Sequence, residues 1–270
     1  MILLNKPHPG LVETRDTRHD LPMTSFATVL AITLGALTAV SAQQAADPAA
    51  VPNADAILQG ARMAATLTTL EEGLSGNLKK DGKTVPVTLF LKGKNIQFQF
   101  AEIKNTWQGF HMQLNDAAFD LFEVVNGKLA RFPAAKLTQP IAGTDVTYED
   151  LAMRFFYWPN PKLEGIENIN GEACYKVRVD QPKDAAGRYA AVYIWVHRKY
   201  GAFMRIQGYD KGGGLAKEFT VQEVMQVTDK IWSLKKMQIA THDPADKGRR
   251  LSITNLVFDE PKKARPKGLH

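Results

Sequence analysis

Hydrophobic and polar residues alternate along most of this chain after about residue 70. The stretches 83–92 and 94–100 carry apolar side chains at every second position, most plainly Ile96, Phe98 and Phe100 against Gln97 and Gln99. Such alternation is typical of strands with one face in a core. Gly, Asn and Asp mark the predicted turns between strands, at 81–82, 93, 115–116 and 126–127.

The alternating pattern is interrupted between residues 131 and 141, where Pro133 and Pro140 cannot donate to a strand ladder. It returns beyond Pro161 and predicts six further strands, at 173–179, 189–197, 202–209, 215–224, 232–240 and 251–258. Glycines at 187, 201, 212–214 and 248 fall in the predicted turns between them.

Two segments follow the helical period instead. Residues 55–66 place apolar side chains three and four apart, and Asn53 or Asp55 can cap the first turn. A second helix is expected to begin at Tyr148, because Thr147 and Asp150 form a capping box. Pro159 is expected to end it, and its apolar side holds residues 148, 151, 152, 155 and 156.

Together these elements predict an α+β fold that is mainly antiparallel β. About ten or more strands exceed what a flat open layer accommodates, so a strongly curved or partly closed sheet is expected. The two short helices are expected to cover its concave face.

The N-terminal region has the pattern of an export signal. Phe26–Val40 is an apolar run shorter than the about 20 residues that span a bilayer. Small residues precede Gln43, so we expect a signal peptide at 1–42 cleaved after Ala42, with Met23 as an alternative start and a retained anchor as the alternative to cleavage. A flexible linker at 43–54, one domain at 55–260 and a basic tail at 261–270 complete the predicted organisation, which places the mature protein in the periplasm.

Composition narrows the function classes. The single cysteine, Cys174, provides neither a disulfide framework nor a metal cluster, and it does not follow the signal core as a lipoprotein cysteine does. The net charge of +6 lies in the mature part without base-stacking motifs, so nucleic acid is not an expected partner. Motifs for phosphate loops, nucleophile elbows and zinc proteases are absent from the sequence, so we expect neither an enzyme nor a metal or cofactor site. We also expect the protein to be a monomer.

Residues 155–158 read Phe-Phe-Tyr-Trp, an unusual run of four rings. Four consecutive rings on a short helix cannot all face one core, so some are expected to meet another apolar surface. Packing in the core and contact with a ligand remain alternative explanations.

Several segments resemble the outer membrane lipoprotein-sorting family, the relatives of the LolA and LolB carriers. The resemblance covers most of the chain after about residue 55, and its most specific part is the Gly-Thr-Asp to Asp-Leu stretch at 143–152. It also includes residues 171–175, 195–198, 204–205, 209–210, the strand around Trp232 and residues 254–256.

The resemblance implies a half-open antiparallel barrel over short helices, with an apolar cavity that shields the acyl chains of lipoproteins or lipids. An inner-membrane donor and an outer-membrane acceptor would be its protein partners. The ligand contacts it suggests are Leu151, Phe155, Phe156 and Trp158 on the aromatic helix, and Phe98, Phe100, Trp195 and Phe203 on the sheet. The alternative function on the same fold is an envelope stress sensor or another module that binds a protein partner.

Overall fold

The computed structural model describes residues 3–5, 52–66, 70–101, 107–114, 119–125, 128–228, 231–246 and 248–260, all within one compact unit. The predicted cleavage site, the turns at 115–116 and 126–127 and the basic tail lie outside the described residues.

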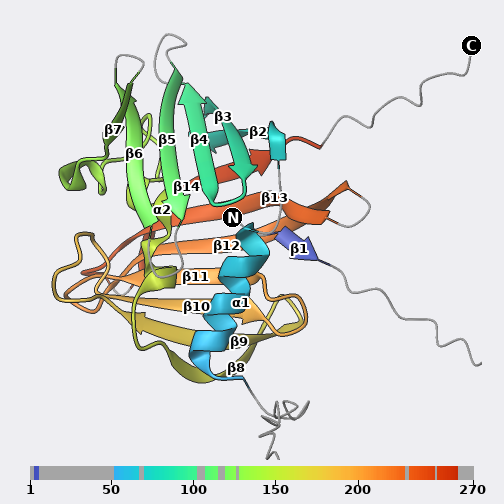
Figure 1. The fold of residues 1–270 in the computed structure, drawn as a ribbon. Helices are drawn as coiled ribbons and strands as arrows, with labels where there is room; N and C mark the ends of the chain where they lie inside the picture. The colour runs from blue at the N-terminus through green and yellow to red at the C-terminus, as the bar shows by residue number, and fades with distance from the viewer. Residues whose placement is uncertain are drawn as a thin grey trace, which may run out of the picture. The chain divides into compact units, whose positions relative to one another are not determined.

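One large antiparallel sheet dominates the fold (Figure 1). Its strands are β2 (Leu70–Lys80), β3 (Lys83–Lys92), β4 (Asn95–Ala101), β5 (Trp107–Leu114), β6 (Phe119–Val125), β7 (Lys128–Arg131), β8 (Lys162–Ile169), β9 (Glu172–Asp180), β10 (Ala191–His197), β11 (Phe203–Tyr209), β12 (Leu215–Thr228), β13 (Ile231–Asp243) and β14 (Arg249–Phe258). A short strand β1 (Leu3–Asn5) pairs with the start of β13.

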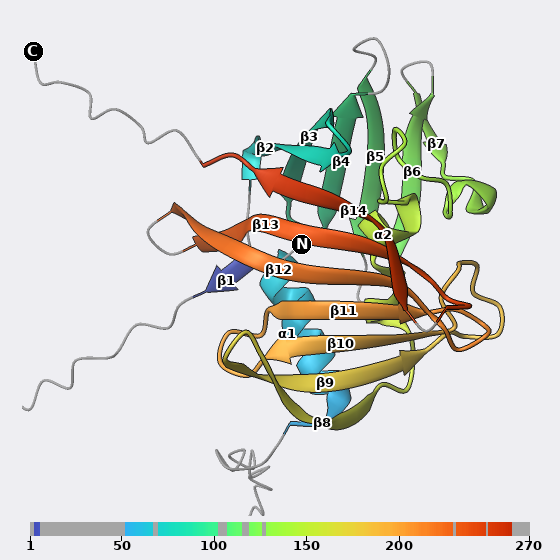
Figure 2. The same ribbon diagram turned by 180° about the vertical axis from the view of Figure 1, so that it is seen from behind.

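Strand order shows that the sheet is not closed within the described part of the chain. The order runs from β7 through β2 to β14, and then from β13 to β8. Among the described strands, β7 and β8 end this order and do not pair with each other. Figure 2 shows the two halves, β2–β7 and β8–β13, turned toward different directions. The predicted fold class, a curved half-open barrel with two helices, is therefore confirmed.

The two faces of the sheet differ in burial, as the alternating pattern predicts. In β4, Ile96, Phe98 and Phe100 are buried, whereas Gln97 and Gln99 between them are only partly covered. We call the face that bears the three apolar side chains the inner face. One large hydrophobic core fills the space against it.

Helix α1 (Ala54–Thr66) lies across the inner face of the second half of the sheet, in front of β9–β11 in Figure 1 and behind them in Figure 2. Its buried side chains, Ile57 and Leu58 among them, belong to the main core. Asn53 caps the helix, because its Oδ1 accepts a hydrogen bond of 2.8 Å from the backbone N–H of Ala56.

Residues 137–158, which we call the strap, connect the two halves of the sheet between β7 and β8. The strap contains helix α2 (Tyr148–Ala152), whose predicted capping box is confirmed. Thr147 Oγ1 accepts from the backbone N–H of Asp150 at 3.2 Å, and Asp150 Oδ2 accepts from that of Thr147 at 2.9 Å.

The strap helix is shorter than predicted. Met153 adopts a left-handed backbone conformation with φ 46°, which ends α2, and residues Arg154–Tyr157 continue as a 3₁₀ helix. The expectation of one helix that runs to Pro159 was therefore wrong. The break changes the direction of the chain, so the rings of 155–158 do not share one helical face.

Candidate functional site

An apolar cavity lies between the strap and the inner face of the sheet. Its volume is about 40 Å³. Asp150 is the single charged residue among the lining residues, which are Leu78, Val87, Phe98, Phe100, Ile141, Val146, Asp150, Leu151, Met153, Phe203, Phe219, Leu234, Met237, Ile239, Leu256 and Phe258. A space of this size holds roughly three water molecules. Ligand pockets usually measure about 300–1,000 Å³, so the cavity is too small for a ligand, and we call this arrangement of the strap the closed state.

The strap's own side chains fill the rest of the concave space. Ile141, Val146 and Phe155 are each at most 3% exposed. Tyr148 packs against three rings, with centroid separations of 5.9 Å to Phe100, 5.4 Å to Phe110 and 4.8 Å to Phe132. Movement of the strap would therefore open a much larger apolar space.

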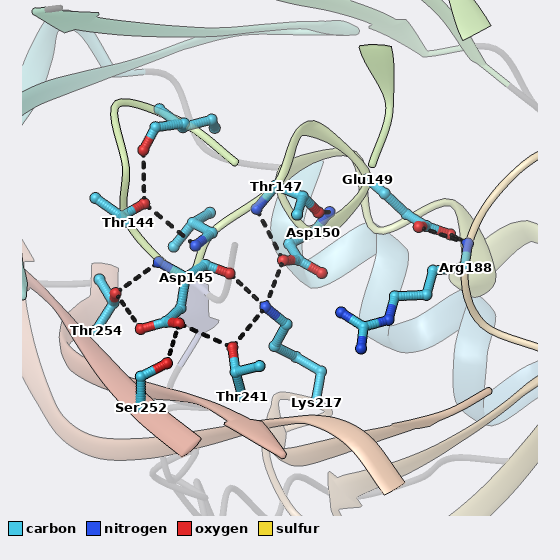
Figure 3. Close-up of polar contacts among 12 residues, drawn as sticks. Thr144, Asp145, Thr147, Glu149, Asp150, Arg188, Lys217, Thr241, Ser252 and Thr254 are labelled. Carbon is cyan, nitrogen blue, oxygen red and sulfur yellow. Dashed lines mark hydrogen bonds and ion pairs between the residues drawn. The ribbon is translucent and has the colours of Figure 1, made fainter. Parts of the chain in front are cut away.

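A polar cluster holds the strap to the sheet at one end of this cavity (Figure 3). Its centre is Asp145, whose side chain is 5% exposed. Oδ1 of Asp145 accepts hydrogen bonds from Lys80 at 3.1 Å, Thr241 at 2.9 Å and Ser252 at 2.5 Å. Oδ2 accepts from Thr254 at 2.9 Å, and the same hydroxyl oxygen accepts from the Asp145 backbone N–H at 2.8 Å.

Lys217 extends the cluster toward α2. This side chain is 3% exposed and donates to the backbone carbonyl of Asp145 and, at 3.1 Å, to Thr241. Its ammonium also lies 3.6 Å from Oδ2 of Asp150. The other carboxylate oxygen of Asp150 accepts a hydrogen bond of 2.5 Å from the buried Tyr189 hydroxyl. The carboxylate of Asp150 thus compensates the charge of the buried Lys217, and Thr241 links Lys217 to the carboxylate of Asp145.

Glu149 makes a second connection, between α2 and the loop before β10. Both of its carboxylate oxygens accept from the backbone N–H of Arg188, at 3.1 and 2.9 Å. Gly187 permits this approach, because a Cβ at that position would overlap Oε1 of Glu149. The φ of 142° at Gly187 also disfavours any other residue.

Two of the three buried carboxylates of the strap, Asp145 and Glu149, have opposite pKa shifts. Burial alone would raise the pKa of Asp145, but hydrogen bonds from Ser252, Lys80, Thr254 and Thr241 outweigh it and lower that pKa below its usual value. Burial raises the pKa of Glu149 to about 7, and the nearby charge of Asp150 adds to the shift. At neutral pH, Asp145 is therefore ionised, whereas Glu149 is only partly so.

Four of the eight predicted contact residues line the cavity. Leu151 belongs to α2, Phe98 and Phe100 to β4, and Phe203 to the start of β11. Their assignment as ligand contacts remains a proposal.

Three others, Phe155, Phe156 and Trp158, are buried beside the cavity rather than in its lining. The ring of Phe156 packs on Phe203 with a centroid separation of 5.9 Å, and Phe155 contacts both Phe156 and Trp158. Tyr157 turns another way, toward α1, where the Arg62 guanidinium lies 5.1 Å from its ring centroid. The four rings thus meet different surfaces of one core.

Trp195 lies apart from these residues. It belongs to a separate small cluster with Ile169 and Cys174, and its indole N–H donates to Glu167 at 2.8 Å. Its neighbours along β10, Ile194 and Val196, are part of the main core instead. Trp195 therefore faces away from the cavity.

The donors of the Asp145 cluster were not among the residues predicted for the site. The residues predicted for the site are all apolar or aromatic, whereas Lys80, Lys217 and the three hydroxyl residues are single polar positions on four different strands. The available signal was Lys217 itself, which takes an inner position two residues before Phe219 in a strand of alternating pattern.

Within the described ranges, no three His, Cys, Asp or Glu side chains come together as a metal site. No helix in the same part of the chain is both long and apolar enough to cross a membrane.

Three solved structures share this fold. A DUF1329 family protein from Desulfovibrio piger is 18% identical, with a TM-score of 0.56, over 80% of this chain and 96% of its own. A LolA superfamily protein from Nitrosomonas europaea is 17% identical, with a TM-score of 0.54 and the same coverage of 80% and 96%. A domain assigned to outer membrane lipoprotein sorting, from Vibrio parahaemolyticus, is 17% identical, with a TM-score of 0.54 over 72% of this chain and 86% of its own.

Comparison of the sequence with protein families identifies the family of the chain. No curated protein matches the chain. The model of a family described as "uncharacterized protein" matches residues 125–265, just over half of the 270 residues, and so includes the strap and β8–β14. The chain therefore belongs to the family that this model describes, and its fold is that of the LolA-like proteins.

Proposed function

We propose that the protein is a periplasmic carrier that binds acyl chains of lipoproteins or lipids against the inner face of its sheet. The observation that carries this proposal is the apolar cavity beneath a strap that a buried polar cluster connects to the sheet. Leu151 and Met153 from the strap and Phe98 and Phe100 from the sheet line that cavity and would contact the chain.

Physical chemistry favours this use of the fold. An acyl chain in water costs about 0.8 kcal/mol for each exposed methylene group, so transfer between membranes requires a covered apolar site. The closed cavity of about 40 Å³ is too small for such a chain. Binding therefore requires the strap to move, and the chain would replace the strap side chains that now fill the space.

The location follows from the predicted leader. Cleavage after Ala42 would release the domain into the periplasm, where lipoproteins and lipids pass between the two membranes. In that setting, an inner-membrane donor and an outer-membrane acceptor are the proposed protein partners.

Native mass spectrometry with lipid extraction tests the proposal, on protein purified from a bacterial periplasm without detergent. The wild-type protein is expected to carry acyl species. Leu151→Asp places a carboxylate in the cavity lining at a partly covered position, and it is expected to lose them. Leu251→Asp is the matched control, because Leu251 is 55% exposed and is not among the lining residues. A ligand-free wild-type protein, or equal loading of both variants, contradicts carriage.

A partner-binding module is the second candidate function, and the exposed end of the sheet supports it. Trp107, Val124 and Leu129 are 51%, 45% and 59% exposed. They lie on the adjacent strands β5, β6 and β7, where Val124 pairs with Leu129. A ligand-free wild-type protein that loses a bound partner protein on Trp107→Ser would favour this function over carriage.

A further inference from the structure

The donors that surround Asp145 all belong to the sheet, whereas the acceptor belongs to the strap (Figure 3). Lys80 comes from β2, Lys217 from β12 and Thr241 from β13, and β14 supplies Ser252 and Thr254. All five side chains hydrogen-bond to Asp145, four to its carboxylate and Lys217 to its backbone carbonyl. The sheet therefore provides two ammonium groups and three hydroxyls directed at one residue of the strap.

These donors continue the inner face that forms the cavity. Side chains two residues apart on a strand point to the same face. On each of four strands, a donor lies two residues from a residue that lines the cavity, and these pairs are Leu78 and Lys80, Phe219 and Lys217, Ile239 and Thr241, and Leu256 and Thr254. The sheet wall is therefore amphipathic, with an apolar chamber next to a group of cationic and hydroxyl donors.

Movement of the strap would separate the carboxylates of the polar cluster from its cations. Asp145 and Asp150 would leave with the strap, whereas Lys217 and Lys80 would stay on the sheet. In the closed state Lys217 pairs with Asp150 and Lys80 pairs with Asp145, and an ammonium that stays beside an apolar wall is unfavourable without a negative partner. The open state is thus most stable when another anion takes the place of these two carboxylates.

We propose that this part of the sheet is an anion site that Asp145 occupies in the closed state and that the head group of the ligand occupies in the open state. The inference rests on the proposed carrier function and specifies its ligand class. The ligand is an amphiphile with an acyl chain for the chamber and an anionic carboxylate or phosphate for the donors around Lys80 and Lys217.

The proposed anionic amphiphile differs from an uncharged acyl glycerol in the charge of its head group. Such a ligand fills the apolar chamber equally well but leaves the two ammonium groups without a counter-ion. Hydrogen bonds to charged groups contribute about 1.5–3 kcal/mol each. Loss of one such bond corresponds to about a tenfold or larger change in affinity.

Pairs of ligands with the same chains test the head group directly. We suggest competition at pH 8, read by native mass spectrometry, between hexadecanoate and hexadecanol and between phosphatidylglycerol and diacylglycerol. The anionic member of at least one pair is expected to bind about tenfold more tightly or better. Preference in the first pair alone identifies a carboxylate site, and preference in the second alone identifies a phosphate site.

Two variants test whether the preference for an anionic head group arises at the donors around Asp145. Lys80→Met removes a cation whose side chain is 21% exposed, and Ser252→Ala removes a hydroxyl with little change in volume. Each is expected to reduce the anion-to-neutral ratio severalfold. Lys79→Met is the matched control, because this neighbouring lysine is exposed on the opposite face of β2 and should leave the ratio unchanged. The ratio isolates the head group, since easier opening of the strap affects both members of a pair alike.

The failures are distinguishable. If neither member of either pair binds, the carrier function itself is refuted. If both members bind equally in both pairs, carriage stands and the anion site is refuted. An anion preference that survives both Lys80→Met and Ser252→Ala also refutes the site, because another part of the protein would then recognise the head group.

Discussion

Glu149 gives a quantitative prediction about pH and stability. Its pKa rises from 4.5 to about 7 on folding, because the carboxyl is buried between α2 and the loop before β10. A shift of one pKa unit corresponds to about 1.4 kcal/mol. The difference of about 2.5 units therefore makes a proton on Glu149 stabilise the folded state by about 3 kcal/mol. This contribution is complete below pH 4.5 and is lost as the pH rises through 7.

Glu149→Gln removes this titration while it keeps the size of the side chain. We expect the free energy of unfolding of the wild type, relative to this variant, to fall by about 3 kcal/mol between pH 4.5 and pH 8. Urea denaturation at several pH values measures both proteins. The difference between them cancels groups that titrate in both, such as His111, whose pKa is lowered by burial.

Glu164→Gln, at an exposed position of β8, is the control and should show no comparable change between pH 4.5 and pH 8. Parallel stability curves for the wild type and Glu149→Gln would refute the reasoning. They would mean that Glu149 keeps an ordinary pKa and that its burial does not penalise the charge.

Three further substitutions test the strap and the faces of the sheet. Thr147→Ala removes the capping box of α2 and should lower the free energy of unfolding by about 1 kcal/mol, measured by urea denaturation; no change would show that the cap contributes nothing. Gly187→Ala introduces a Cβ that overlaps Glu149 and a strained φ, so we expect a loss above about 2 kcal/mol and a lower melting temperature; wild-type stability would contradict the close approach. Trp195→Phe loses the hydrogen bond to Glu167, which should cost about 1 kcal/mol, but it should leave acyl binding unchanged in the mass spectrometric assay; reduced binding would contradict its outward position.

Local patterns were sufficient for much of the fold. The strand at 83–92 has the bounds that its alternation predicts, and Asn53 and Thr147 cap the helices as their positions suggest. Strand β8, however, was missed. Apart from Ile169 at its end, its residues are exposed or only partly covered, and Gly165 interrupts the pattern, so this edge strand has no apolar alternation to detect.

The site was harder to predict than the fold. Residues 191–197 are apolar or aromatic on both faces, so periodicity alone could not show that Trp195 points away from the core that holds Ile194. The Asp145 cluster depends on partners that lie 65 to 109 residues away along the chain. Apart from the inner position of Lys217, the single Ser, Thr and Lys residues carry no local signal for such contacts, which arise only when four strands and the strap meet.

The response of the strap to a ligand tests the central claim most directly. Hydrogen–deuterium exchange can be followed with and without bound hexadecanoate at the amides of Asp145 and Arg188, which in the closed state donate across the edge of the strap to Thr254 and to Glu149. Displacement of the strap predicts that these amides lose protection when the ligand binds, while amides of β12 and β13 keep theirs. Unchanged or increased protection of these amides in the loaded protein would contradict the claim that an acyl chain takes the place of the strap.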